Sequence, residues 1–135
     1  MEKIYTLSNG TIVKVKATNK RETCTKSFNL RHYAYTITFM VNDKKFSTTF
    51  HDSAYNYCNR IGATEKMIDE AVNAIILDAR AYANHTNFYD FCNAFGYEIH
   101  DNEGYRVWNS CAKICEKLED VLNSTEIEEL LEITE

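Results

Sequence analysis

The spacing of the apolar residues changes once along this chain, and that change restricts the folds available to it. Apolar and polar residues alternate over residues 3–7, 11–17 and 33–50, as in strands with one buried face. From Thr64 onward the apolar residues recur every three or four positions, as on one face of a helix. A chain of 135 residues can bury a core of its own. We therefore predict a single α+β domain over residues 1–135, mainly strands in 1–52 and mainly helices in 53–135.

The first two strands are predicted from a turn signal. Asn9-Gly10 separates two alternating runs, residues 3–7 and 11–17, and this dipeptide is the strongest short signal for a β-hairpin. A two-residue turn at this position places Leu7 opposite Ile12 and Thr6 opposite Val13.

A second hairpin is predicted over residues 33–51, with Asn42-Asp43 as its two-residue loop. This register sets Phe39 opposite Phe46, Ile37 opposite Thr48 and Tyr35 opposite Phe50, so that aromatic and β-branched side chains pair on one face. Residues 18–29, between the hairpins, are polar and have no period. They are predicted to form a surface loop or a crossover.

The helical part begins with a long stripe over residues 64–84. Its core-facing residues are predicted to be Ile68, Ala71, Val72, Ile75, Ala79 and Tyr82, and Thr64 is the expected N-cap. A short aromatic helix follows, with Phe88, Phe91, Cys92 and Phe95 on one stripe. Thr86 or Asn87 can cap its start, and Gly96 is expected to end it in a left-handed conformation.

A second long helix is predicted over residues 103–122, with Asp101 or Asn102 as its cap. Its stripe includes Trp108 and two cysteines. The last residues contain Thr125 three positions before Glu128, the pattern of a capping box, so a short terminal helix is expected. The predicted fold is therefore about four antiparallel strands in hairpins, followed by a layer of three to four helices.

His51, Asp52 and Ser53 are the residue types of a hydrolytic triad, and they are contiguous. Triad members must converge in space, whereas successive residues of a strand point to opposite faces. No G-x-S-x-G elbow surrounds Ser53 either. We interpret Asp52 or Ser53 as the cap of a short helical turn that runs through Cys58 and ends near Gly62, and we predict no catalytic residue.

The five cysteines are an odd number without a secretory signal, which argues against a disulfide framework. Cys111 and Cys115 lie one helical turn apart, and Cys92 with His100 would complete a four-ligand zinc set. No C-x-x-C pair exists, however, and both helical cysteines continue an apolar stripe. We predict reduced, mostly buried thiols and no metal site.

Neither a membrane segment nor a nucleotide-binding loop is predicted. The first residues, MEKIYTLSNG, lack an apolar signal region, and no apolar run approaches the roughly 20 residues that span a bilayer. The four glycines never cluster, so no phosphate loop or cofactor is indicated. These features predict a protein of the cytoplasm.

Charge is unevenly distributed along the chain. Residues 1–50 hold 9 Lys and Arg against 3 Asp and Glu, whereas residues 116–135 hold 1 against 8. Segregated charge steers association, so both ends are candidates for contact with a partner. The candidate partner-binding residues are Lys20, Arg21, Lys26, Glu116, Glu119, Asp120, Glu126, Glu128, Glu129 and Glu132.

The basic strands also allow a nucleic-acid interface. Six basic side chains could bind phosphates, with Tyr33 and Tyr35 stacking on bases: Lys14, Lys16, Lys20, Arg21, Lys26 and Arg31. An acidic overall pI of about 5.4 opposes generic affinity for nucleic acid. The acidic helices could instead imitate the charge of a nucleic acid and occupy a cationic channel.

Several segments from Thr48 onward resemble a group of small phage-encoded proteins, mostly of unassigned function. These are TTFHDS, IILDA, FYDFCNAFGYEIHD, the stretch 105–118 and EIEELLE, which follow the group's recurring order over residues 48–135. The most specific is F-x-x-F-C-x-x-F-G-Y-x-x-x-D, from Phe88 to Asp101. The resemblance implies a phage or mobile-element origin, and it supplies no catalytic residues.

Small phage proteins of this type often counter bacterial defence, as anti-CRISPR proteins do. The leading hypothesis is therefore a non-enzymatic protein of the host cytoplasm that binds and inhibits a host defence protein or ribonucleoprotein complex. The first alternative is a nucleic-acid-binding accessory protein that uses the basic strand face. The second is a hydrolase that uses His51 or Ser53.

Overall fold

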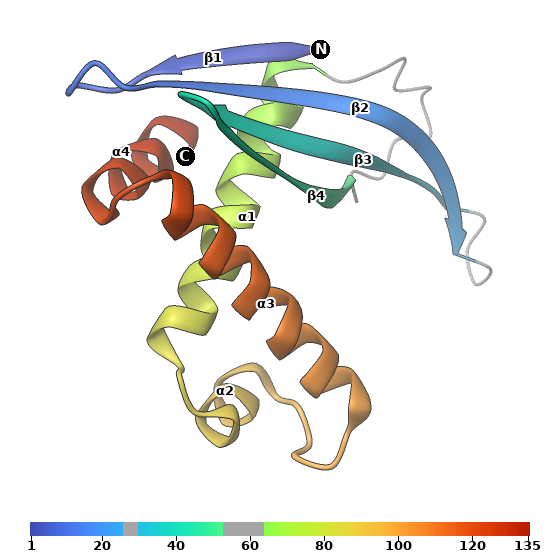
Figure 1. Ribbon diagram of the computed structural model, residues 1–135. Helices are drawn as coiled ribbons and strands as arrows, with labels where there is room; N and C mark the ends of the chain where they lie inside the picture. The colour runs from blue at the N-terminus through green and yellow to red at the C-terminus, as the bar shows by residue number, and fades with distance from the viewer. Residues whose placement is uncertain (26–29, 53–63) are drawn as a thin grey trace.

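The computed structural model describes residues 1–25, 30–52 and 64–135, and it consists of an antiparallel sheet followed by helices (Figure 1). The sheet has the strand order β1-β2-β3-β4. The elements are β1 (Glu2–Thr6), β2 (Ile12–Thr25), β3 (Leu30–Val41), β4 (Lys44–Asp52), α1 (Glu65–Asn84), α2 (Phe88–Phe95), α3 (Asn102–Val121) and α4 (Ser124–Thr134). The predicted α+β class is confirmed.

The β1–β2 hairpin forms where it was predicted, but its register was wrong by one residue. Thr6 pairs with Ile12 and Tyr5 with Val13. The loop has three residues, because the Leu7 amide donates to the Thr11 carbonyl and the Gly10 amide donates to the Leu7 carbonyl, each at 2.9 Å. Gly10 takes the left-handed conformation (φ 88°) that such a loop requires. Asn9-Gly10 therefore closes a three-residue loop instead of a two-residue turn.

The predicted loop was also wrong for residues 18–25, because β2 continues to Thr25 and pairs with β3 as far as Leu30, whereas residues 26–29 lie outside the described part of the chain. The register shifts between Thr18 and Arg21, and Asn19 takes a positive φ of 53° there, as at a β-bulge. Pairing of this extension uses backbone groups, so it needs no alternating apolar pattern. The two hairpins thus form one continuous sheet.

The β3–β4 hairpin confirms the predicted register in full. Phe39 pairs with Phe46, Ile37 with Thr48 and Tyr35 with Phe50. The rings of Phe39 and Phe46 stack with their centroids 4.8 Å apart. The loop residue Asn42 has the positive φ (55°) expected in a tight hairpin loop.

The core lies between one face of the sheet and the helices. Val13, Val15 and Phe39 are fully buried on that face, whereas Lys14 and Lys16 alternate with them on the other. On α1 the buried face is wider than predicted, since Met67 and Ile76 also have no exposed surface. The reason is that α1 contacts the sheet, α3 and α4 together.

Helices α1, α2 and α3 begin at their predicted caps. The side-chain oxygens of Thr64, Asn87 and Asp101 accept backbone N–H bonds from the first turns of α1, α2 and α3. Gly96 ends α2 with a φ of 77°. Asp52 and Ser53 were the two expected caps of the turn after β4. Asp52 is the last residue of β4, and Ser53 lies outside the described residues.

Replacing Thr64 with alanine is expected to lower the free energy of unfolding by about 0.5–2 kcal/mol, because the Met67 amide would lose its partner at 3.1 Å. Urea denaturation measures the change. Thr86→Ala is the matched control, since Asn87 and not Thr86 caps α2. Equal losses in the two variants would show that Thr64 does not act as a cap.

The capping box of α4 lies two residues before the predicted one. Asn123 Oδ1 accepts from the Glu126 amide at 2.8 Å, and Glu126 Oε1 accepts from the Asn123 amide at 2.9 Å. The predicted box of Thr125 and Glu128 was therefore wrong, because Asn123 starts an overlapping N-x-x-E pattern. Glu126 therefore has a structural role at the start of α4.

Candidate functional site

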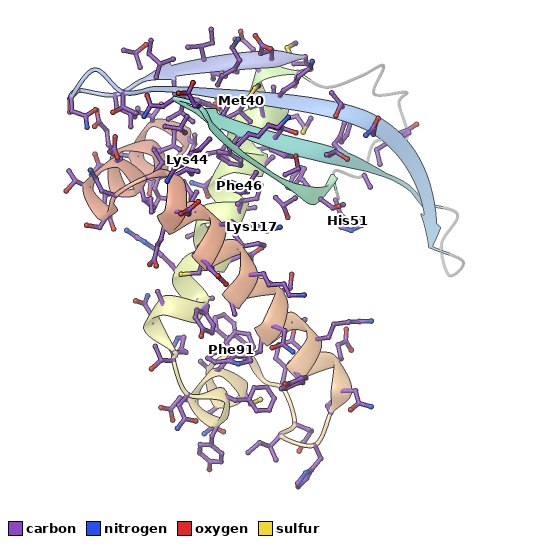
Figure 2. All side chains as sticks on the ribbon, in the orientation of Figure 1. Met40, Lys44, Phe46, His51, Phe91 and Lys117 are labelled. Carbon is purple, nitrogen blue, oxygen red and sulfur yellow. The ribbon has the colours of Figure 1, made fainter. Side chains whose placement is uncertain are left out.

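The acidic candidates on α3 lie on its exposed face. Glu116, Glu119 and Asp120 are all exposed, but Lys113 and Lys117 lie among them. Lys44, the first residue of β4, donates to the Asp120 carbonyl at 3.1 Å and lies 3.7 Å from its carboxylate. Figure 2 shows Lys44 beside the end of α3 nearest the sheet. This surface is mixed in charge, not uniformly acidic.

The acidic candidates on α4 are partly used within the molecule. Glu126 is only 9% exposed and accepts from Asn9 Nδ2 at 3.1 Å. Glu129 accepts from the Ser8 amide at 2.7 Å and from the Ser8 hydroxyl at 2.9 Å. Both carboxylates thereby join α4 to the β1–β2 loop. Their role in binding a partner stays a prediction.

The two remaining α4 candidates are exposed. Glu128 forms an ion pair with Arg80 of α1 at the edge of a groove between α1, α3 and α4. This groove has a volume of about 200 Å³ and a mostly apolar lining that includes Ile76, Leu118 and Ile127. Glu132 is exposed near the C-terminal end of α4.

Glu126 predicts a pH dependence of stability. Its hydrogen bond with the Asn123 backbone, and then those with Thr11 and Asn9, lower the pKa of this carboxyl against the opposing effect of burial. A lowered folded-state pKa stabilises the protein above the unfolded-state pKa of about 4.3, and this contribution is lost as the pH falls through the folded-state value. We expect Glu126→Gln to flatten the acid limb of the stability profile.

The measurement is the free energy of unfolding by urea at several pH values between roughly 3 and 6, across the range in which glutamate titrates. Glu132→Gln, on the same helix but exposed, is the matched control and should keep the wild-type profile. An unchanged acid limb in Glu126→Gln would contradict the role of these hydrogen bonds.

The basic candidates occupy the long sheet. Lys20 and Arg21 belong to β2, and Lys26 lies outside the described residues. On the sheet face away from the core, Lys14, Met40 and Lys45 lie on neighbouring strands in one row. Tyr35 is 2% exposed in the core. The expectation that Tyr35 stacks on bases was therefore wrong, because its alternation places it on the helix-covered face.

A surface that was not predicted lies at the other end of the molecule. The helical tip, defined as residues 85–106, consists of α2, the turn after it and the start of α3, and it projects away from the sheet (Figure 1). At its centre Phe91 is 2% exposed, with ring centroids 4.8 Å from Phe95 and 5.0 Å from Trp108. Figure 2 shows Phe91 in this position, far from the labelled residues of the sheet.

The helical tip exposes large apolar side chains. Tyr89 is 57% exposed, Phe95 50%, Ile99 41% and Tyr105 58%. Phe95 was predicted to lie on the buried stripe, but α2 is covered on one side only, and burial on the stripe is confined to Phe91 and Cys92. Four exposed large apolar side chains in so short a segment make the helical tip a candidate interaction site.

The helical tip is also acidic. Its charged side chains are Asp90, Glu98, Asp101, Glu103 and Arg106, and all five are exposed. Arg106 lies 3.9 Å from Glu103. No basic side chain in the described part of the chain forms an ion pair with Asp90, Glu98 or Asp101.

Gly104 fixes the approach of α3 to the turn that precedes it. A Cβ at this buried position would lie 2.9 Å from Tyr97 Cβ, an atom that cannot move without its backbone. Gly104→Ala is expected to destabilise the protein by about 1–2 kcal/mol, because overpacking outweighs the gain of about 1 kcal/mol in helix propensity. Thermal unfolding measures this, and Ser110→Ala, exposed on the same helix, should be neutral or slightly stabilising. A rise in Tm for Gly104→Ala would contradict the close approach.

The three cysteines whose burial the structure describes are packed in the interior, as predicted, whereas the side chains of Cys24 and Cys58 lie outside the described part of the chain. Cys92, Cys111 and Cys115 are free and buried. Burial, together with the charge of Asp78, raises the pKa of the Cys111 thiol to about 11, and burial with Glu119 raises that of Cys115. These thiols are therefore protonated at neutral pH, and a protonated thiol is a poor nucleophile.

The described residues contain no group of three or more His, Cys, Asp or Glu side chains placed to hold a metal ion. His51 is exposed near the end of β4, and Ser53 lies outside the described residues. No helix in the described part of the chain has the length and apolar content needed to cross a membrane.

Comparisons with known protein families, with curated proteins and with solved structures find no match for this chain. The candidate site therefore depends on the geometry described above, and the likeness to phage-encoded proteins stays a prediction from the sequence.

Proposed function

We propose that this chain acts by binding another macromolecule, and that it inhibits a host defence complex of the CRISPR effector kind without chemistry of its own. The observation that carries the proposal is the helical tip, which presents four large apolar side chains to solvent. Exposed apolar side chains gathered in one short segment cost solubility, and they are usual where a partner covers them. The defence complex as target comes from the resemblance of residues 48–135 to small phage-encoded proteins.

A binding role is also supported by the way the helical tip is held. Its aromatic side chains contact one another, and α1 and α3 connect it to the core. A surface that is ordered before association loses less conformational entropy on binding than a mobile loop does. The buried, protonated cysteines need no role in such a mechanism.

The test is to mix the purified chain with candidate effector complexes, and to measure co-elution on gel filtration together with cleavage of the target nucleic acid. We expect co-elution with one class of complex and loss of its cleavage activity. An unrelated acidic protein of similar size serves as the control. Failure to bind any complex, together with failure to protect phage in cells, would reject the proposal.

A second candidate function is nucleic-acid binding through the outer face of the sheet. The observation in its favour is that Lys14, Lys16 and Lys45 lie on the face that the helices leave uncovered. A salt titration of binding to single- and double-stranded DNA and RNA tests it, because phosphate contacts are strongest at low ionic strength. Absence of binding at low salt would remove this alternative.

A further inference from the structure

We propose that the helical tip binds a positively charged protein segment, whose arginine or lysine side chains lie on the exposed aromatic rings. This inference rests on the proposed function, because it names the kind of partner surface that the binding protein contacts. The acidic residues that the sequence suggested for partner binding all lie outside the helical tip.

The first observation is where the exposed apolar surface is concentrated. Among the side chains that the structure describes, nine large hydrophobic ones are at least 41% exposed, and four of these lie within residues 89–105. Three of the four are aromatic: Tyr89, Phe95 and Tyr105. Aromatic side chains supply large contact areas and are typical anchors of protein interfaces.

The second observation is the negative charge around these rings, which favours a basic partner. Four exposed carboxylates against one guanidinium repel the phosphates of a nucleic acid and attract a basic segment. Arginine and lysine side chains also bind directly to the faces of tyrosine and phenylalanine rings. The same surface therefore offers basic side chains both ion pairing and ring contacts.

The third observation is that two of the exposed rings are held from behind by other rings. Tyr105 packs edge-on against Phe88 with centroids 5.7 Å apart, and Phe95 packs against Phe91 at 4.8 Å. Phe88 also contacts Trp108 at 6.1 Å. The ring faces are thus oriented before a partner arrives, which lowers the entropic cost of binding.

The experiment measures binding of three synthetic peptides of equal length, rich in arginine, in lysine or in glutamate, by isothermal titration calorimetry at low and moderate salt. The wild-type chain is expected to bind the two basic peptides, the arginine peptide more tightly, and not the acidic one. Tyr89→Ala combined with Tyr105→Ala should weaken binding about tenfold. Asp90→Asn combined with Glu98→Gln should weaken it and reduce its dependence on salt.

Matched controls distinguish specific binding at the helical tip from nonspecific binding elsewhere on the protein. Ile4→Ala combined with Ile12→Ala removes apolar side chains that are 55% and 54% exposed on the sheet, and it should leave peptide binding unchanged. Glu70→Gln combined with Glu132→Gln removes two exposed charges outside the helical tip, and it should change binding little. Tyr89→Leu combined with Tyr105→Leu keeps apolar area without an aromatic face, and it should behave like the alanine pair.

Two results of the peptide experiment would overturn the inference. One is equal binding of the basic peptides by the wild-type chain and by the tyrosine variants. The other is tighter binding of the glutamate peptide, or of a single-stranded RNA, at the helical tip. Circular dichroism confirms that each variant is folded before it is compared.

The outcome separates this inference from the proposed function. If the tyrosine variants still co-elute with and inhibit an effector complex as the wild-type chain does, the inference fails and the proposed function stands. If no complex is inhibited but the peptides bind with the expected variant pattern, the proposed function fails and the inference about the surface stands.

Discussion

Replacing Phe91 with alanine is expected to lower the stability of the helical tip by about 3–5 kcal/mol, the usual cost of removing a buried phenylalanine ring. Phe91 is 2% exposed and contacts the rings of Phe95, Tyr97 and Trp108, so its loss leaves a cavity among aromatic neighbours. Phe91 lies outside the cluster of buried residues that the sheet shares with the helices. The effect should therefore be strongest at the helical tip.

Hydrogen exchange of individual amides measures this directly. In Phe91→Ala, exchange in the helical tip should accelerate far more than exchange in β2 and β3. Phe95→Ala is the matched control, since it is the same substitution on the same helix at a site that is 50% exposed. Similar acceleration in the two variants would contradict the assignment of Phe91 as the centre of the helical tip.

Replacing Phe39 with alanine is expected to destabilise the whole protein by about 3–5 kcal/mol. Phe39 has no exposed surface, stacks on Phe46 across the β3–β4 hairpin and lies in the main core. Marginally stable proteins have only about 5–15 kcal/mol to lose, so this variant should approach the limit of folding.

The measurement is urea denaturation followed by circular dichroism, with the slope m compared as well as the midpoint. Phe50→Ala is the control, because Phe50 is only partly buried on the neighbouring strand and should lose less stability. A cost below about 1 kcal/mol for Phe39→Ala would contradict the packing described here, since that is less than the usual effect of a buried large-to-small change.

The sequence predicted the parts of this fold that depend on local chemistry. The β3–β4 register followed from matching Phe39 with Phe46, and the caps Thr64 and Gly96 followed from residue preferences at helix ends. Each of these signals lies within a few residues of the structure it determines. They were therefore readable without any knowledge of the tertiary contacts.

Where two local solutions compete, the sequence was less informative. Asn9-Gly10 fits both a two-residue turn and the three-residue loop that forms, and the choice shifts the pairing by one residue. At α4, two overlapping patterns of a polar residue followed by glutamate were available, and Asn123 is the cap. The continuation of β2 beyond Thr18 is a backbone pairing that polar side chains do not reveal.

The candidate site depends mainly on contacts between distant parts of the chain. Ser8 and Glu129 are 121 residues apart in sequence, so no local pattern could show that this carboxylate is already hydrogen-bonded. Similarly, helical periodicity placed Phe95 on the apolar stripe of α2. It could not show that the core ends before Phe95, which is 50% exposed. A clue was present in the density of aromatic residues from α2 to the start of α3, where seven lie within residues 88–108.

The most direct measurement is the stoichiometry of inhibition of a defence complex that the chain binds. A protein that acts by binding should inhibit in proportion to its molar ratio, with complete inhibition only near one chain per site, and activity should return when the complex is diluted or the chain is removed. Lasting loss of activity at a small fraction of one chain per complex would contradict this, because it would require each chain to act on many targets as an enzyme.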